Sequence, residues 1–227
     1  MTEKDVADTR VGIEAGVDFF ALSFVRESSD VVELRQFLKD NGSDAKVVAK
    51  IEDQSGIENL NEIIEVSDAL MVARGDLGIE VPYEELPIIQ MEAVDAALSK
   101  GVPVIMATHL LESMTESPMP TRAEITDVSN SVFEKVDCVM LSGETSVGKY
   151  PVECVNVLNK ITRNVERYAD RGGFNQSLPL STTREKLMKS AVIMARELGG
   201  VGIVVYSSNG LHVRTLSSLR PYGCPMY

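Results

Sequence analysis

Apolar and polar positions follow two alternating patterns along most of this chain. Short apolar runs, each ending in polar or charged residues, are typical of buried parallel strands. Five such runs begin near Phe19, Lys46, Ala69, Pro103 and Cys138. Because a longer segment of different periodicity follows each run, the pattern predicts a parallel α/β fold.

The segments between these runs carry apolar residues at the three- and four-residue spacing of helices. Several of them open with Ser, Thr or Pro and close with Gly, which are common helix boundaries. This spacing predicts helices over Ser29–Lys39, Ile57–Val66, Glu84–Lys100 and Thr121–Val136, and a longer helix from Tyr150 to about Arg171.

The composition changes after the fifth strand and its helix. A polar stretch that opens with two glycines is typical of a linker, and a second region follows it. The pattern of apolar residues in that region predicts a helix over Glu185–Leu198, a strand over Val201–Tyr206 and a helix over Leu211–Leu219. We therefore predict one domain over residues 1–172, a linker over residues 173–182 and the start of a second domain over residues 183–227.

Composition and charge limit the classes of function. The 227 residues are 44% hydrophobic, which is enough for a sizeable core. No apolar stretch approaches the roughly 20 residues of a membrane span. Lys and Arg number 22 against 34 Asp and Glu, and the net charge of −12 argues against nucleic acid or a membrane as a partner. The three cysteines form no CxxC pair and no secretory leader is visible, so we expect a cytoplasmic protein.

Polar and reactive residues follow all five predicted strands. The carboxyl ends of parallel strands meet at the same edge of a sheet, which is the active-site face of α/β barrels. These strand-end residues are Ser23 and Arg26, Lys50 and Glu52, Arg74 and Asp76, Thr108 and His109, and Ser142 and Glu144. Five such endings in succession predict a catalytic rim.

Lys50, Glu52 and Asp76 are the most informative members of this rim. Lys50 and Glu52 are two residues apart, so on a strand they point to the same face. Asp76 ends the next apolar run. One ammonium and two carboxylates can hold a divalent cation beside an anionic substrate, as phosphoryl transfer and enolate chemistry require. The alternative is an ordinary surface ion pair between Lys50 and Glu52, which the nearby Asp76 disfavours.

Longer blocks of the sequence resemble a known family. The strings VVAKIED, DALMVARGDLGIEVP, PVIMATHLLESM, PMPTRAEITDVSN and VMLSGETSVGKYPVE resemble consecutive blocks of pyruvate kinase, in order and at matching intervals. The resemblance covers nearly the whole chain. It implies a (β/α)8 TIM-type barrel enzyme of glycolysis that transfers the phosphoryl group of phosphoenolpyruvate to ADP, with Mg²⁺ or Mn²⁺ and usually with K⁺.

The resemblance also implies roles for individual residues. Lys50 would stabilise the transferring phosphoryl group and the enolate oxygen, and Glu52 and Asp76 would be the Mg²⁺ ligands. The backbone of Gly75 and Asp76 would receive the substrate carboxylate. Thr108 would lie near the carbon atom that is protonated after the phosphoryl group has left.

Two further groups of residues receive supporting roles by resemblance. Arg74 belongs to the substrate-binding set, where we expect it to orient the rim rather than take part in the chemistry. In the second region, the family forms part of an effector pocket for sugar phosphates from a loop that corresponds here to Ser207, Ser208, Asn209 and Gly210. Hydroxyl, amide and backbone donors of such a loop suit a phosphate.

An eight-stranded barrel of about 250 residues is expected for this architecture, yet five strand–helix units are visible. We therefore expect a fragment: the last five units of the barrel, followed by the beginning of the C-terminal α/β domain. By resemblance, the full-length enzyme would also hold the K⁺ site and would form a homo-oligomer, a tetramer. Alone, we expect this chain to have negligible phosphoryl transfer activity.

Two alternatives stay open on the sequence. One is a related Mg²⁺-dependent barrel that cleaves or forms carbon–carbon bonds through a pyruvate enolate, which the same strand-end carboxylates would serve. The SGETSVGKYPVE block and the appended second region argue against it. The other is a noncatalytic fragment or subunit.

Overall fold

One parallel sheet organises the first two thirds of the chain. The computed structural model describes residues 1–169, 178–221 and 223–227. Its five strands lie in the order β1-β2-β3-β4-β5, and each pairs in parallel with the next along the chain. They are β1 (Phe19–Leu22), β2 (Lys46–Ile51), β3 (Ala69–Ala73), β4 (Val104–Ala107) and β5 (Cys138–Met140). The predicted parallel α/β fold is confirmed.

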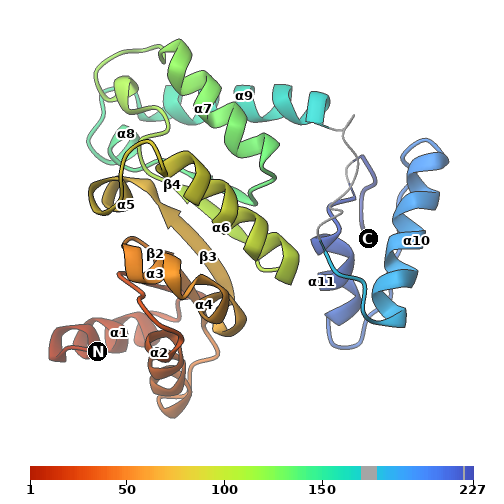
Figure 1. Ribbon diagram of the computed structural model, residues 1–227, viewed down its shortest axis with the longest axis horizontal. Coiled ribbons are helices and arrows are strands. Elements are labelled where there is room, and N and C mark those ends of the chain that lie inside the picture. The colour runs from red at the N-terminus through yellow and green to blue at the C-terminus, as the bar shows by residue number, and fades with distance from the viewer. Residues whose placement is uncertain (170–177, 222) are drawn as a thin grey trace.

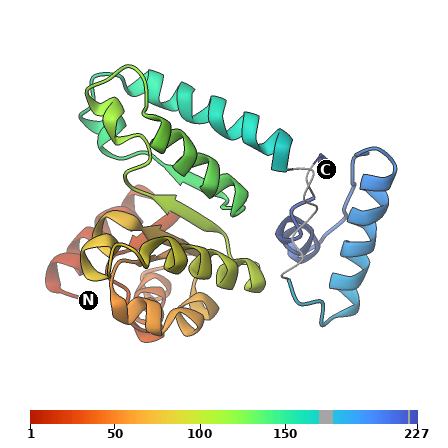
Figure 2. The same cartoon turned by 45° about the horizontal axis from the view of Figure 1, so that its top comes forward.

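Helices connect the strands and continue beyond the sheet (Figures 1 and 2). Those up to β4 are α1 (Glu3–Ala15), α2 (Ser28–Asp40), α3 (Gln54–Glu58), α4 (Leu60–Val66), α5 (Arg74–Glu80) and α6 (Leu86–Lys100). After β4 come η1 (Glu112–Thr115), α7 (Arg122–Phe133), α8 (Gly143–Ser146), α9 (Pro151–Ala169), α10 (Thr183–Glu197) and α11 (Leu211–Ser218). Figure 1 shows α10 and α11 at the opposite side of the molecule from α1 and α2.

The main core lies between one face of the sheet and the helices α2, α4 and α6. Alternate residues of β2, such as Val47, Ala49 and Ile51, pack there against Leu34, Leu38 and other helical residues. On the opposite face, Val48 of β2 joins a smaller cluster with Met71 and Ala107. Burial on both faces explains why these strands have near-continuous apolar sequences, and it leaves polar residues to the strand ends.

The second region has an apolar cluster of its own. Val192 of α10 packs with Leu216 and Leu219, and Leu178 and Ile203 contact this cluster. Among the described residues, one ion pair connects the region to the sheet: the Arg220 guanidinium forms two hydrogen bonds with the carboxylate of Asp137, which directly precedes β5. The predicted domain boundary remains a prediction. Of the predicted linker, residues 173–177 lie outside the described part of the chain, and residues 178–182 form no helix or strand.

Several predicted helices have different limits in the structure. The helix expected over Ile57–Val66 is two helices. The Asp53 side chain accepts a hydrogen bond from Gly56 N and starts α3 early, and Asn59 separates the end of α3 at Glu58 from the start of α4. The helix expected from Glu84 begins at Leu86, and a separate helix, α5, directly follows β3. The expected end near Arg171 lies outside the described residues.

Two elements of the sequence-based prediction were wrong. No strand forms over Val201–Tyr206: its pairing among the described residues is one bridge between Ile203 and Met226. The segment forms three backbone hydrogen bonds with Pro225 and Tyr227, a contact that is shorter than a strand pair. The sequence also gave no prediction for α1, whose one buried residue is Thr9. A helix without an apolar stripe has no periodic signal. Within the described ranges, no helix is long and apolar enough to cross a membrane.

Candidate active site

Lys50 and Glu52 meet at the carboxyl end of β2. Lys50 Nζ lies 2.8 Å from Glu52 Oε1 and also donates a hydrogen bond of 2.8 Å to Ser23 Oγ, which follows the neighbouring strand β1. Glu52 is 1% exposed, and its Oε2 accepts a hydrogen bond of 2.6 Å from Phe24 N. Because the carboxylate is buried and each of its oxygens has a partner, this contact is not an ordinary surface ion pair.

Asp76 reaches the same edge of the sheet from the next strand. Ile51 pairs with Val72, so the register places Glu52 beside Ala73, and α5 begins one residue later. Asp76 is exposed in the first turn of α5. Within the described part of the chain its carboxylate has no hydrogen-bond or ion-pair partner. Adjacent strands thus deliver one buried carboxylate and one that is open to solvent.

Thr108 ends β4 and contacts the start of α5. Its Oγ1 accepts a hydrogen bond of 2.7 Å from Gly75 N and donates one of 2.7 Å to the Ala107 carbonyl. The structure therefore brings Thr108 and Gly75 together, as expected for one rim. The Gly75 amide is engaged with the Thr108 hydroxyl, so of the two amides predicted to receive the substrate carboxylate, that of Asp76 is the one without a side-chain partner among the described residues.

Arg74 contacts two protein groups behind the rim, and its predicted orienting role stays a prediction. Its side chain is 9% exposed, and Nη1 lies 2.6 Å from Asp127 Oδ1 on α7. Nη2 donates a hydrogen bond of 2.8 Å to the Thr108 carbonyl, whereas Nε is buried without a hydrogen-bond partner. Arg74 thus joins β4, α5 and α7 behind the rim, and its guanidinium points to protein partners.

Backbone strain is concentrated at these strand ends. Five described residues other than glycine have a positive φ, and three of them lie at this edge: Phe24 (51°), Thr108 (69°) and His109 (54°). The left-handed conformation costs an L-residue about 1–2 kcal/mol. Such strain persists where surrounding contacts impose it, and it clusters at active sites and ligand clamps. It therefore marks the ends of β1 and β4 as candidate functional backbone.

The remaining strand-end residues make structural contacts. Glu144 is completely buried, and its carboxylate accepts hydrogen bonds from Leu111 N at 3.0 Å and Ser142 N at 2.8 Å. It therefore ties together the segments that follow β4 and β5. Arg26 Nε lies 2.7 Å from Asp53 Oδ2. Burial alone would raise the pKa of Asp53, but hydrogen bonds from Gly56 N–H and Arg26 outweigh it and lower that pKa.

Sequence reasoning missed the residues behind the rim. Asp127, Gln90 and Glu134 come from helices, where no strand-end pattern marks them. Gln90 Nε2 donates to both Glu134 carboxylate oxygens, at 3.0 and 2.8 Å. Burial raises the pKa of Glu134 despite this contact. These three residues, with Arg74 and His109, line a cavity of about 350 Å³. A signal for Asp127 existed only in its position within a block that resembles the family.

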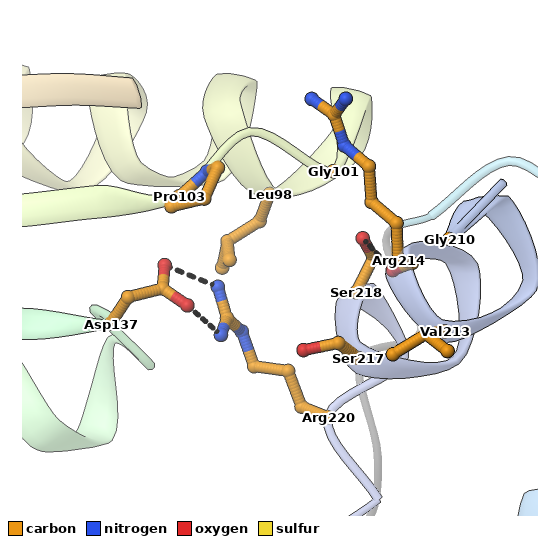
Figure 3. A pocket seen from close by; sticks show the side chains of 10 residues that line it. All are labelled: Leu98, Gly101, Pro103, Asp137, Gly210, Val213, Arg214, Ser217, Ser218 and Arg220. Carbon is orange, nitrogen blue, oxygen red and sulfur yellow. Dashed lines mark hydrogen bonds and ion pairs between the residues drawn. The ribbon is translucent and has the colours of Figure 1, made fainter. Parts of the chain in front are cut away.

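The predicted effector loop lies away from the rim. Ser207 Oγ accepts a hydrogen bond from His212 N, and Asn209 Oδ1 accepts one from Leu211 N at 3.1 Å, so both side chains serve the start of α11. Ser208 and Gly210 are exposed. A cavity of about 440 Å³ separates α11 from the turn between α6 and β4 (Figure 3). The Arg220–Asp137 pair lines this cavity at the amino ends of β4 and β5. Of the predicted effector loop, Gly210 lines the cavity.

Comparison with known proteins identifies the family. Residues 1–155 match the model of the pyruvate kinase barrel domain. The chain belongs to the pyruvate kinase family. A pyruvate kinase from Dictyostelium discoideum is 44% identical over 97% of this chain and 45% of its own length. Pyruvate kinases from Sporosarcina psychrophila (43% identical, 100% of this chain, 39% of the relative) and Thermoplasma acidophilum (42%, 97% and 40%) match similarly. The chain thus spans about two fifths of the length of these curated relatives.

The family assignment agrees with the architecture. Five parallel strands in sequential order are consistent with part of a pyruvate kinase barrel domain, as predicted. The relatives named above are all pyruvate kinases, so the comparisons do not favour the alternative of a carbon–carbon lyase.

The rim residues also suit the divalent cation that the family resemblance implies. Among residues that the structure describes, no group of three or more His, Cys, Asp or Glu side chains is arranged to hold a metal ion. Mg²⁺, however, commonly takes one or two carboxylates and leaves its other positions to water and substrate oxygens. The unpartnered carboxylate of Asp76 and the remaining lone pairs of Glu52 are hard oxygen donors of that kind. The donor set therefore fits Mg²⁺.

Proposed function

We propose that the carboxyl ends of β1–β4 carry the metal- and phosphoryl-handling half of a site that transfers the phosphoryl group of phosphoenolpyruvate to ADP. The observation that carries the proposal is the Lys50 ammonium, held 2.8 Å from the buried Glu52 carboxylate, with Asp76 after the end of the neighbouring strand. In this reaction the bond between phosphorus and the enol oxygen breaks, and an oxygen of the ADP β-phosphate forms the new bond to phosphorus. The enolate then takes a proton on carbon to give pyruvate.

Lys50 is suited to the charge that develops in this step. A compact ammonium stabilises negative charge as it shifts from the phosphoryl group to the enol oxygen. The Ser23 hydroxyl and the Glu52 carboxylate hold the amine from two sides, so Lys50 needs little reorganisation to meet the substrate. Glu52 and Asp76 would hold Mg²⁺, which when bound neutralises phosphate and enolate charge.

Thr108 and its neighbours support the carbon end of the substrate. The Thr108 hydroxyl both accepts and donates hydrogen bonds, so it can orient a proton donor near the enolate carbon. The Asp76 amide, in the first turn of α5, is suited to the substrate carboxylate. The proposal leaves Arg74 without a chemical step, because its guanidinium is occupied by Asp127 and Thr108.

Other parts of the proposal rest on the family resemblance alone. They are glycolysis in the cytoplasm, K⁺ as a second cofactor bound outside this chain, and a homo-oligomeric enzyme. They also include a regulatory phosphate site at Ser207, Ser208, Asn209 and Gly210, and the division into domains over residues 1–172 and 183–227 with a linker between them.

Metal and substrate binding test this function directly. Mn²⁺ binding, measured by loss of the free-ion electron spin resonance signal, is expected at about one ion per chain. Glu52→Gln and Asp76→Asn should each weaken it at least tenfold, whereas Glu62→Gln, at an exposed carboxylate of α4, should leave it unchanged. Lys50→Met should retain Mn²⁺ and lose phosphoenolpyruvate binding, measured by calorimetry with Mg²⁺ present.

The outcomes separate the candidate functions. An unsubstituted chain that binds no Mn²⁺, or a Glu62→Gln variant that loses as much affinity as Glu52→Gln, contradicts the proposal. Mn²⁺ binding without any phosphoenolpyruvate binding favours the noncatalytic alternative. Circular dichroism of each variant shows whether lost binding reflects lost folding, since Glu52→Gln removes the partner of a buried ion pair.

A further inference from the structure

Two consecutive residues, Thr108 and His109, hold a left-handed backbone conformation at the end of β4. Neither is a glycine, so contacts from outside the turn must impose this conformation. Thr108 has two such contacts. Its hydroxyl accepts the Gly75 N–H at 2.7 Å, and its carbonyl accepts Arg74 Nη2 at 2.8 Å. The turn is therefore fixed from the first two residues of α5.

Arg74 in turn depends on a partner from a distant part of the sequence. Its side chain is 9% exposed. A charge that is buried without a partner is strongly destabilising, so a buried guanidinium needs a paired carboxylate. Asp127 Oδ1, 53 residues later on α7, lies 2.6 Å from Nη1. Because Nε has no hydrogen-bond partner, Asp127 and the Thr108 carbonyl are the two groups hydrogen-bonded to the guanidinium in the described part of the chain.

The geometry points to Asp127 as a positioning residue for the candidate site. Acting through Arg74, Asp127 holds the Thr108 turn so that the Thr108 hydroxyl stays against the Gly75 amide. Removing the carboxylate would free the buried guanidinium to move toward solvent or toward another carboxylate. The Thr108 carbonyl would then lose its donor, and the strained turn would relax.

Glu134 does not replace Asp127 in this arrangement. It lines the same cavity, but Gln90 Nε2 occupies both of its carboxylate oxygens, and burial raises its pKa. No ion pair joins Glu134 to Arg74 among the described residues. Glu134 therefore offers a matched control: a carboxylate at the end of the same helix and beside the same cavity, whose charge acts on Arg74 through space but which forms no ion pair with it among the described residues.

Hydrogen exchange of the Gly75 amide reports the positioning directly. In the full 227-residue chain, Asp127→Ala should raise the exchange rate of Gly75 N–H at least tenfold. The rate of Leu70 N–H, which is bonded to the Pro103 carbonyl at 2.8 Å in the sheet, should change less than twofold. Asp127→Glu should restore the Gly75 rate to within threefold, and Glu134→Ala should leave it unchanged.

A second measurement tests whether Asp127 affects substrate binding at the candidate site, and this part of the inference rests on the proposed function. Calorimetric affinity for phosphoenolpyruvate with Mg²⁺ should fall about tenfold in Asp127→Ala and recover to within threefold in Asp127→Glu. Lys50→Met should lose this binding while the Gly75 exchange rate stays unchanged. A chain that binds no phosphoenolpyruvate contradicts the proposed function, and the exchange rates still decide the role of Asp127.

Two results would overturn the inference: a Gly75 exchange rate that Asp127→Ala leaves unchanged, or one that Glu134→Ala raises equally. If Asp127→Ala does not fold, Asp127→Asn keeps a hydrogen-bond acceptor but removes the charge. A rise of about threefold in Gly75 exchange would then support positioning, and a change below 1.5-fold would contradict it.

Discussion

Single residues with a left-handed backbone show where this fold stores strain. Thr108, His109 and Phe24 do so at the candidate site, where neighbouring contacts hold them. Lys135 has φ 67° without such a role, because it simply follows the end of α7. Its N–H bonds to the Val132 carbonyl and Val136 N–H bonds to Ser131, a helix ending at which glycine is the favoured residue. The strain at Lys135 is therefore removable, unlike that at the rim.

Lys135→Gly should stabilise the protein. Glycine removes a steric cost of about 1–2 kcal/mol, but it also makes the unfolded chain more flexible, which opposes folding. We therefore expect a net gain of about 0.5 kcal/mol in the free energy of unfolding. Urea denaturation measures the change. Lys39→Gly, in the last turn of α2, is the matched control and should destabilise by about 1 kcal/mol. Equal losses in both variants would contradict the role of φ.

At the scale of elements, short caps decide where the helices of this sheet begin. Asp53 starts α3 immediately after the strand that carries Lys50 and Glu52, and its second carboxylate oxygen pairs with Arg26 beyond β1. The Asp53 side chain thus links the start of α3, the end of β2 and the segment that follows β1. Such a cap fixes the path of the chain as it leaves the rim.

Asp53→Asn should make stability less dependent on pH in the acid range. Hydrogen bonds lower the pKa of Asp53 in the folded state, so its carboxylate contributes stability above its unfolded pKa of about 3.9 and loses it as the pH falls. Asparagine retains the cap but not the charge. We expect a deficit of up to about 1 kcal/mol at pH 7 that shrinks as the pH falls through the lowered folded-state pKa of Asp53.

Urea denaturation between pH 2.5 and 7 measures this deficit. Asp44→Asn, at an exposed carboxylate before β2, is the control and should show no pH-dependent difference from the unsubstituted chain. A deficit for Asp53→Asn that stays constant across the range would mean that the contribution comes from packing and not from charge.

Much of the sheet was predictable because both of its faces are buried. Continuous apolar runs mark β1 to β5, and the polar residues that end them locate the rim, including the Lys50–Glu52 pair. The network behind the rim was not predictable from pattern. Asp127 and Arg74 are 53 residues apart, and only the packing of α7 against the sheet end brings them together. For the same reason, the sequence could not show that Thr108 occupies the Gly75 amide.

At the scale of the whole molecule, the charges at the rim are already paired. Lys50 pairs with Glu52, Arg26 with Asp53 and Arg74 with Asp127. Apart from Lys50, which the proposed function assigns to the transferring phosphoryl group, no Lys or Arg among the described strand-end residues is therefore left to hold a phosphate. We expect turnover of phosphoenolpyruvate and ADP by this chain to stay near background in an assay coupled to pyruvate reduction. Turnover at an ordinary enzymatic rate by the purified monomer would contradict this expectation.

The edges of the described sheet predict self-association. Strand β1 pairs with β2 alone, β5 pairs with β4 alone, and Phe19 and Phe24 beside the β1 edge are 59% and 53% exposed. Open edges with apolar side chains template further pairing. Light scattering after gel filtration should show a mass that rises with concentration. Phe19→Lys should reduce this rise and Val152→Lys, at an exposed position of α9, should not.

The Arg220–Asp137 pair should couple the second region to the sheet. Asp137 Oδ2 also accepts a hydrogen bond of 2.8 Å from Val104 N, so the carboxylate joins the start of β4 to Arg220, whose own backbone has φ 50°. A double-mutant cycle with Arg220→Gln and Asp137→Asn should give a coupling free energy of about 1 kcal/mol, because the pair is bidentate and half-buried. The exposed Lys149–Glu116 pair should give a clearly smaller coupling free energy in the same urea measurement. Equal coupling energies would mean that the contact shown in Figure 3 does not hold the two regions together.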